Sequence, residues 1–234
     1  MTSLPAPTIV LLDMDGTTVR HINPKLLSTL ELIDDCLFKL SSAFTRQQPL
    51  LNTSHQPTNA SGAMAHRVLH SLRRKKVNEI VQPCPGVFTF LNVLKEHGIP
   101  IGIVSNGLGK GYGHEILETF GLKDYFKAQI FREDIHKSKP HPDPLIRALK
   151  QIKDPLDEQD VVWHIGDRHK DIVAALNANL ILPCEVIPFS YGVPAAITIL
   201  KKGVSPDHII LNYAEFAGRV KSILKTPPAK LMYS

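Results

Sequence analysis

The sequence contains few cysteines and no long apolar run. Its 234 residues include only Cys36, Cys84 and Cys184, which are widely spaced and form no C-x-x-C pair. Three such residues suit reduced cytosolic thiols better than a disulfide framework. No uninterrupted apolar segment is long enough to cross a bilayer, and the N-terminus has no basic stretch followed by an apolar core. We therefore expect a soluble, cytoplasmic protein without a membrane partner.

Motifs for common cofactors are also absent. The glycines between residues 107 and 113 alternate and so miss the G-x-G-x-x-G spacing, and no G-K-[ST] P-loop occurs. His66 and His70 have the i, i+4 spacing of zinc ligands on a predicted helix, but the glutamate of H-E-x-x-H is missing. These absences argue against nucleotide-cofactor binding by those routes and against a zinc site on that helix.

Positive charge is concentrated in one short segment. The formal net charge is +5, and basic side chains gather between residues 67 and 76, notably in Arg73-Arg74-Lys75-Lys76. A solvated helix face is the commoner origin of such a run, so we expect no nucleic-acid partner. A positively charged surface at the entrance of a cleft, which attracts anionic substrates, would have the same composition. The sequence leaves these two interpretations open.

Short apolar runs alternate with helical patterns along most of the chain, and 43% of the residues are hydrophobic. Strands separated by helices predict right-handed βαβ crossovers and a parallel sheet, hence an α/β fold with a Rossmann-like core. The predicted strands span residues 8–12, 100–104, 128–131, 161–165, 180–187 and 209–211. The predicted helices span residues 86–97, 113–120, 143–151, 169–177, 194–201 and 213–224.

A long segment after the first strand interrupts this alternation. Helical patterns at residues 24–40 and 64–80 flank a polar stretch at residues 41–62, which we expect to form a mobile loop. We interpret the segment as a helical cap inserted into the core. The predicted domains are a Rossmann-like core of residues 1–18 and 84–226, a helical cap of residues 19–83, and a loose tail of residues 227–234.

The most informative motif, Asp13-Met14-Asp15-Gly16-Thr17, follows the first predicted strand. Two carboxylates this close repel each other, so a metal cation or a shared proton must hold them together. One carboxylate could attack phosphorus as a nucleophile, while the other protonates the leaving oxygen and later activates water. An Asx turn that caps a helix or loop is the structural alternative.

Two further segments offer groups that could bind an anion. Ser105 and Asn106 follow a predicted strand, and the Ser105 hydroxyl can donate to an anionic oxygen. A Ser/Asn-capped βα turn would have the same sequence. Lys139 stands in a loop with Pro140 and Pro142, which restrict where its ammonium can reach. A lysine held in this way suits phosphate neutralisation.

A second pair of carboxylates lies near the end of another predicted strand. Asp167 ends that strand, and Asp171 follows four residues later in the first turn of the next predicted helix. This spacing brings both carboxylates to one site and suits the hard oxygen ligands of Mg²⁺. Helix N-capping explains one of the two aspartates easily and both less well. Because all four motifs follow strand ends, one crevice would collect four carboxylates, a hydroxyl and an ammonium.

This ordered pattern resembles the haloacid dehalogenase superfamily, in the phosphoglycolate-phosphatase-like branch that carries a helical cap after the first motif. The resemblance implies that Asp13 is the nucleophile and also a Mg²⁺ ligand. It implies that Asp15 is the general acid/base and that its backbone carbonyl binds the metal. Dehalogenating members of the family lack an acid at this second position, so the resemblance favours phosphoryl chemistry.

The remaining motifs receive their roles from the same resemblance. Ser105, Asn106 and Lys139 form the phosphate-binding set, in which Asn106 supports the loop. Asp167 completes the metal shell, and Asp171 acts on the metal directly or through water.

The resemblance thus implies a Mg²⁺-dependent phosphatase that hydrolyses a small phosphorylated metabolite through an aspartyl-phosphate intermediate. A phosphomutase of the same family would use the same groups but return the phosphoryl group to a bound sugar. A non-catalytic binding module on the same fold is a third interpretation, against which the intact acidic set argues. We expect a monomer or a homodimer.

Overall fold

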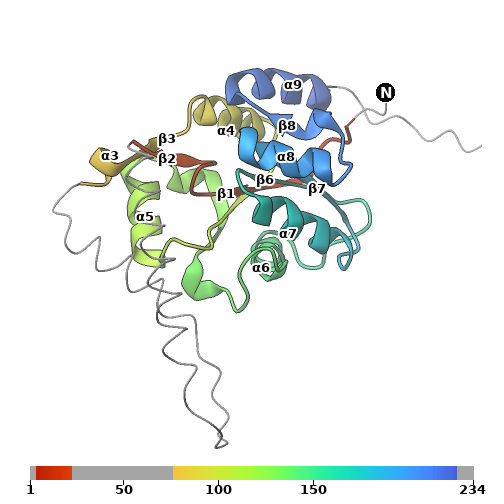
Figure 1. Ribbon diagram of the computed structural model, residues 1–234, viewed down its shortest axis with the longest axis horizontal. Helices are drawn as coiled ribbons and strands as arrows, with labels where there is room; N and C mark the ends of the chain where they lie inside the picture. The colour runs from red at the N-terminus through yellow and green to blue at the C-terminus, as the bar shows by residue number, and fades with distance from the viewer. Residues whose placement is uncertain (1–3, 23–75, 226–234) are drawn as a thin grey trace, which may run out of the picture. The chain divides into compact units, whose positions relative to one another are not determined.

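The structure is a computed structural model that describes residues 4–22 and 76–225 (Figure 1). The chain divides into two units. One unit consists of Met1–Arg20 together with Pro83–Ser234, and the other is His21–Gln82. The first unit contains every strand of the main sheet and all the site residues predicted from the sequence.

A six-stranded parallel sheet forms the centre of the first unit, with the strand order β5-β4-β1-β6-β7-β8. Its central strand β1 is a short apolar run whose five residues are all buried, as expected for a parallel strand covered on both faces. Successive strands are added on one side of β1 and then on the other, so the order reverses at β1. The strands are β1 (Ile9–Asp13), β4 (Ile101–Val104), β5 (Phe126–Ile130), β6 (Val161–Gly166), β7 (Glu185–Tyr191) and β8 (Ile209–Ile210).

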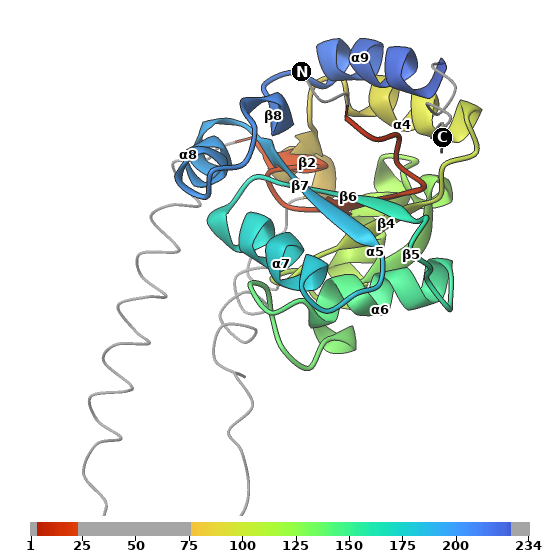
Figure 2. The same ribbon diagram turned by 90° about the vertical axis from the view of Figure 1, so that its right-hand side faces the viewer.

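Helices cover both faces of this sheet (Figure 2). On one face α4 (Val87–Glu96) packs against α9 (Tyr213–Lys225). On the opposite face α6 (Asp143–Ile152) contacts β4 and β5, and α7 (His169–Asn179) contacts β6 and β7. The other helices are α5 (Lys110–Thr119), α8 (Val193–Lys201) and the 3₁₀ helices η1 (Lys123–Tyr125), η2 (Arg132–Asp134) and η3 (Pro206–His208). The predicted Rossmann-like α/β core is thus confirmed.

One predicted strand, at residues 180–187, is wrong in its first half. Leu180 and Ile181 are 81% and 61% exposed, and the backbone N–H of Ile181 bonds back to the Ala178 carbonyl. These apolar residues therefore close the last turn of α7 instead of entering the sheet. Pro183 follows, and β7 begins only at Glu185. The prediction failed because the apolar side chains at the start of this run resemble those of a buried strand, although in the structure they face solvent.

Within the predicted cap, the described residues contain two strands that the sequence did not predict. β2 (Val19–His21) and β3 (Val81–Pro83) pair in a two-stranded sheet, and α3 (Val77–Ile80) directly precedes β3. Strands of three residues are too short to show an alternating pattern. The predicted helix at 24–40, the polar loop at 41–62 and most of the helix at 64–80 lie outside the described residues. Every helix within residues 4–22 and 76–225 is too short or too polar to cross a bilayer.

Candidate active site

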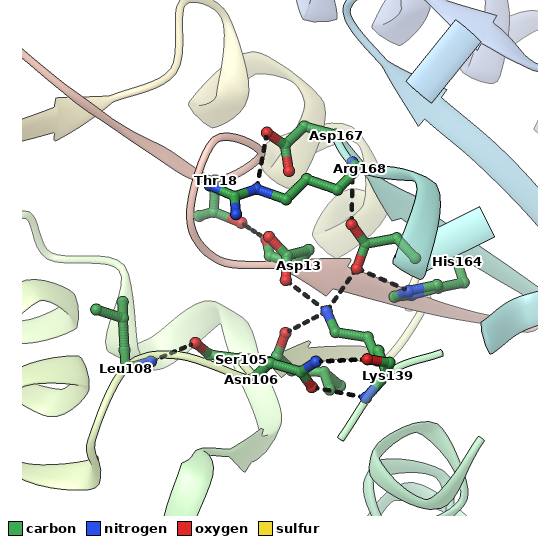
Figure 3. A network of polar contacts seen from close by, with 11 residues as sticks. Asp13, Thr18, Ser105, Asn106, Leu108, Lys139, His164, Asp167 and Arg168 are labelled. Carbon is green, nitrogen blue, oxygen red and sulfur yellow. Dashed lines mark hydrogen bonds and ion pairs between the residues drawn. The ribbon is translucent and has the colours of Figure 1, made fainter. Parts of the chain in front are cut away.

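Asp13 occupies the last position of β1, and the loop after it is tied back to the strand (Figure 3). The Thr18 hydroxyl donates to the Asp13 carbonyl at 2.7 Å, and the backbone N–H groups of Thr18 and Val19 both bond to the Met14 carbonyl. Asp13, Met14 and Thr18 are buried. This compact turn fixes the Asp13 carboxylate at the carboxyl edge of the sheet, beside the point where the strand order reverses.

Gly16 allows the residue after β6 to approach this turn. Its φ is +86°, and a Cβ at this position would lie 2.1 Å from Oδ2 of Asp167. Any side chain would therefore meet both a disfavoured backbone conformation and the carboxylate. Glycine at position 16 brings the loop after β1 into contact with the loop after β6.

Lys139 connects Asp13 to Asp171. Its ammonium lies 2.5 Å from Oδ1 of Asp13 and 2.6 Å from Oδ1 of Asp171, and it donates to the Val104 carbonyl at 3.2 Å. Lys139 is only 3% exposed. Burial alone would lower the pKa of its ammonium, but the charges of Asp13 and Asp171 outweigh burial and raise the pKa. The lysine therefore stays charged and offsets the repulsion between the two carboxylates.

Asn106 holds Lys139 in place through its backbone. The Asn106 side chain donates to the Lys139 carbonyl at 3.1 Å and accepts from the Lys139 backbone N–H at 3.0 Å. The Ser105 hydroxyl oxygen accepts the Leu108 backbone N–H at 3.1 Å, which leaves its own O–H available to donate. Ser105 is buried directly after β4. Both atoms of the Asn106 amide thus bond to the loop of Lys139.

Asp171 is bound by protein groups on both of its oxygens. Oδ1 faces the Lys139 ammonium and lies 3.9 Å from Nε2 of His164, while Oδ2 accepts the Arg168 backbone N–H at 3.1 Å. Burial would raise the pKa of Asp171, but Lys139 and His164 hold it well below its usual range. Gly166 permits this arrangement, because a Cβ there would lie 2.2 Å from the Asp171 Cβ. The carboxylate therefore caps α7 and anchors Lys139.

Asp167 has a different environment. Burial, together with the charges of Asp171 and Asp15, raises its pKa to about 7. Its Oδ1 is buried without a hydrogen-bond partner among the described residues. A carboxylate oxygen in that condition fits a cation, and carboxylate oxygens of Asp13, Asp167 and Asp171 lie within 4.8 Å of one another. These carboxylate oxygens are suitable ligands for Mg²⁺. Oδ1 of Asp167 is the one that is buried without a hydrogen-bond partner among the described residues.

The structure brings the residues predicted from the sequence to one edge of the sheet. Asp13 ends β1, Ser105, Lys139 and Asp167 follow β4, β5 and β6, and Asp171 lies in the first turn of α7. Asp15 lies two residues beyond Asp13, half-buried, and forms an isolated bridge with Val19.

Sequence reasoning missed two groups of this site. His164 lies fully buried inside β6, and neither of its ring nitrogens has a hydrogen-bond partner among the described residues. Nothing in its apolar run indicated that it would face Asp171. Thr18, which anchors the Asp13 carbonyl, is the second. Its position five residues after Asp13, in the loop that follows β1, was the available signal.

Comparison with known proteins gives the following matches. A family model described as haloacid dehalogenase-like hydrolase matches residues 10–182. The phosphoglycolate phosphatase of Yersinia pestis is 30% identical over 141 residues, which cover 60% of this chain and 56% of that protein. Pyrophosphatase PpaX of Oceanobacillus iheyensis is 27% identical over 181 residues, which cover 73% of this chain and 79% of that protein.

A solved structure matches along nearly the whole chain. The crystal structure of a HAD-superfamily hydrolase from Ehrlichia chaffeensis superposes with a TM-score of 0.60 at 20% identity, covering 95% of this chain and 100% of that one. At this identity the likeness concerns the fold. The match with the Yersinia pestis relative spans a little over half of that protein's length.

Proposed function

Because the chain belongs to the haloacid dehalogenase-like hydrolases, we propose that it is a Mg²⁺-dependent phosphatase that acts through an aspartyl-phosphate on Asp13. The observation that carries this proposal is the position of the Asp13 carboxylate, buried at the end of β1 and 2.5 Å from the Lys139 ammonium. A carboxylate held in this way has one oxygen bonded to a cation and a second that can attack phosphorus.

In the first half-reaction, Asp13 attacks the phosphoryl group of a phosphate monoester. Lys139 neutralises charge on the phosphoryl oxygens, and the Ser105 O–H donates to one of them. Asn106 keeps Lys139 in reach through its two bonds to the lysine backbone. The bond from phosphorus to the leaving oxygen breaks as the bond to Asp13 forms, and Asp15 gives its proton to that oxygen.

In the second half-reaction, Asp15 takes a proton from water, which attacks the phosphorus of the aspartyl-phosphate. Inorganic phosphate leaves, and both the Asp13 carboxylate and the protonated Asp15 are restored. Two neighbouring carboxylates can divide the work in this way when their surroundings differ, and the Asp13 carboxylate is held by the Lys139 ammonium.

The metal-binding group would consist of the Asp13 carboxylate, the Asp15 backbone carbonyl and Asp167, with Asp171 acting directly or through water. A divalent cation held there supplies positive charge that lets a phosphate dianion approach the carboxylates. The unpartnered Oδ1 of Asp167 and the raised pKa of that residue support this assignment.

The substrate proposed is a small phosphorylated metabolite. Relatives named as a phosphoglycolate phosphatase and a pyrophosphatase support this class, and their substrates are the first compounds to test. We further propose that residues 19–83 form the cap that selects the substrate, that the protein is cytoplasmic, and that it is a monomer or a homodimer.

The test is a screen for phosphate release over a panel of phosphorylated metabolites, with and without Mg²⁺. We expect Mg²⁺-dependent release from at least one compound. Asp13→Asn should lower kcat by roughly 10³-fold or more without unfolding the protein. Asp124→Asn makes the same chemical change at an exposed position and should leave kcat unchanged.

Two results would contradict the proposal. One is substantial turnover by the Asp13→Asn variant after contaminating phosphatases are excluded. The other is transfer of labelled phosphoryl groups from substrate to a second sugar without release of inorganic phosphate, which identifies a phosphomutase instead.

A further inference from the structure

The loop that carries Lys139 is exposed along most of its length. This Lys139 loop comprises residues 135–142, between η2 and α6. Lys139 is buried within it, whereas most of its neighbours are exposed, namely His136, Lys137, Ser138, Pro140 and His141. Exposed side chains contribute little packing, so hydrogen bonds must fix the backbone here. The position of the Lys139 ammonium therefore depends on the groups that bind this loop.

Asp143, the first residue of α6, binds the loop on both sides of Lys139. Its Oδ2 accepts the backbone N–H of His136 at 3.0 Å and that of Lys137 at 3.4 Å. The backbone N–H of Asp143 in turn donates to Nδ1 of His141 at 3.1 Å. One residue thus connects the segment before Lys139 with the segment after it and closes the loop.

Arg147 holds the Asp143 carboxylate in this orientation. It lies four residues further along α6, and its Nε donates to the same Oδ2 at 3.0 Å. Burial would raise the pKa of Asp143, but Arg147 and the two backbone N–H groups outweigh burial and lower the pKa. The carboxylate is therefore ionised, and a charged acceptor forms stronger hydrogen bonds than a neutral one.

Two asparagines bind the middle of the loop. Asn106 bonds to both backbone groups of Lys139 (Figure 3), and Asn177 in α7 donates to the Pro140 carbonyl at 2.9 Å. These contacts act on Lys139 and on the residue after it. Asp143 adds contacts to the two residues at positions 136 and 137, before the lysine.

The proposed reaction makes the backbone of Lys139 more important. In this structure the ammonium pairs with the carboxylates of Asp13 and Asp171. An Asp13 carboxylate that has become bonded to phosphorus no longer carries its negative charge. The ion pair with Asp13 is then weakened, so the backbone has a larger part in keeping the ammonium beside the phosphoryl oxygens.

We propose that Asp143 is a positioning residue for the reaction, which fixes the Lys139 loop so that the ammonium stays at the phosphoryl group while Asp13 is phosphorylated. Asp143 acts through Lys139 and does not touch the substrate. This inference rests on the proposed function, but the position of the ammonium can be measured without turnover.

The variants are Asp143→Ala, which removes the acceptor, and Asp143→Asn, which keeps one side-chain oxygen for the N–H groups. The matched control is Asp157→Ala, at the opposite edge of the sheet before β6. Asp157 also accepts a backbone N–H, from Gln159, and also pairs with a basic residue four positions away, Lys153.

Steady-state kinetics test the role in the reaction. In Asp143→Ala we expect kcat to fall roughly 10- to 100-fold with KM changed by less than about 3-fold, because the misplaced charge is needed in the transfer step. Asp143→Asn should lose less, and Asp157→Ala should keep the wild-type kcat.

Chemical labelling reports the ammonium directly. Acetic anhydride acylates amines that solvent reaches, and peptide mass spectrometry measures the rate at Lys139. In Asp143→Ala this rate should rise about 10-fold or more, because the loop opens more often. Alkylation of the buried Cys184 thiol reports opening of the whole protein and should not change.

Two results would overturn the inference. A rise of Lys139 labelling and Cys184 alkylation by the same factor would mean that Asp143 only stabilises the fold. A lowered kcat with Lys139 labelled as in the wild type would mean that Asp143 acts by another route. If Asp143→Ala does not fold, Asp143→Asn gives the same comparisons with smaller expected changes.

Failure of this inference is distinguishable from failure of the proposed function. If the wild type releases phosphate and Asp143→Ala keeps the wild-type kcat, only the role of Asp143 is wrong. If no compound of the panel is hydrolysed, the proposed function fails. Faster labelling of Lys139 alone would then still support its positioning by Asp143, and unchanged labelling would overturn it.

Discussion

Asp167 lies just before α7 and Asp171 lies in its first turn, yet their surroundings shift the pKa values of these two residues in opposite directions. Lys139 and His164 outweigh burial at Asp171 and lower its pKa, whereas burial and neighbouring carboxylates raise the pKa of Asp167 to about 7. Both oxygens of Asp171 have protein partners, while Oδ1 of Asp167 has none among the described residues. The Asp171 carboxylate therefore binds protein groups, namely Lys139 and the backbone at the start of α7. The Asp167 carboxylate keeps one oxygen that a cation can bind.

The first prediction concerns Asp167→Asn and pH. The folded-state pKa of about 7 lies above the ordinary value of 3.8, so the folded protein binds more protons than the unfolded chain between these values. The contribution of Asp167 to the unfolding free energy therefore falls as the pH rises through this window. In EDTA, Asp167→Asn should have a higher Tm than the wild type at pH 8, and this difference should shrink at pH 5. Thermal unfolding at both pH values measures it.

Mg²⁺ provides the control for this prediction. Saturating Mg²⁺ should raise the Tm of the wild type at pH 8 and leave that of Asp167→Asn nearly unchanged. Two results would contradict the role of Asp167 as a metal ligand whose charge destabilises the protein without metal. One is an Asp167→Asn variant with a lower Tm than the wild type at pH 8 in EDTA, and the other is a variant whose Tm Mg²⁺ raises as much as it raises that of the wild type.

Among the elements, the loop after β1 depends on a glycine for its shape. The N–H of Gly16 bonds to the Val19 carbonyl at 2.7 Å, and its positive φ turns the chain back so that Thr18 can bond to Asp13. The same turn leaves space for Asp167. Glycine at position 16 therefore allows the loop after β1 to fold back on this strand and to contact Asp167 after β6.

The second prediction compares two glycine substitutions. Gly16→Ala should reduce the unfolding free energy by at least about 1–2 kcal/mol, the cost of a left-handed conformation, and should abolish Mg²⁺-dependent activity. Gly218→Ala should stabilise the protein by about 0.5–1 kcal/mol, because Gly218 lies within α9 and a Cβ there meets nothing within 4 Å. Urea unfolding and phosphate release measure both. Equal effects at the two positions would refute the role given to Gly16.

Helix α9 attaches to the sheet through aromatic rings. The ring centroid of Phe216 lies 5.4 Å from that of Phe90 in α4, 5.5 Å from Phe189 in β7 and 5.9 Å from Trp163 in β6. Phe216 is 4% exposed. This cluster joins two helices and two strands away from the site.

The third prediction follows from this cluster. Phe216→Ala should lower the unfolding free energy by about 3–5 kcal/mol, the usual loss for a buried phenylalanine, with kcat per folded molecule unchanged. Val193→Ala on the exposed side of α8 should change it by no more than about 0.5 kcal/mol. Urea unfolding measures the change in unfolding free energy for both variants, and activity assays measure their kcat. A loss below about 1 kcal/mol for Phe216→Ala would mean that α9 is not held by these rings.

At the scale of the whole molecule, the sheet collects residues that are distant in the sequence. Lys139 and Asp13 are separated by 126 positions and meet because Asp13 ends β1, Lys139 follows β5, and both parallel strands end at one edge of the sheet. This convergence was predictable, since buried apolar runs and the polar residues behind them are visible in the sequence. The membership of the chain in the family predicted from its motifs is confirmed.

Other features could not be predicted, for physical reasons. His164 lies within an apolar run, and only the packing of α7 against β6 brings it near Asp171. Leu180 and Ile181 are apolar but exposed, so their hydropathy pointed to a strand that is not there. The pairing of β2 with β3 joins residues about sixty positions apart through strands too short for a period.

The most direct test of the central claim is chemical trapping of the phosphorylated enzyme. The wild type is mixed with a hydrolysed compound from the panel and Mg²⁺, quenched, and treated with borohydride, which reduces an aspartyl-phosphate to homoserine. Trypsin then releases residues 1–20, because Arg20 is the first basic residue of the chain. Tandem mass spectrometry should locate homoserine at position 13 and none at position 15. Homoserine at position 15, or none in turning-over enzyme, would contradict the assignment of Asp13 as the nucleophile.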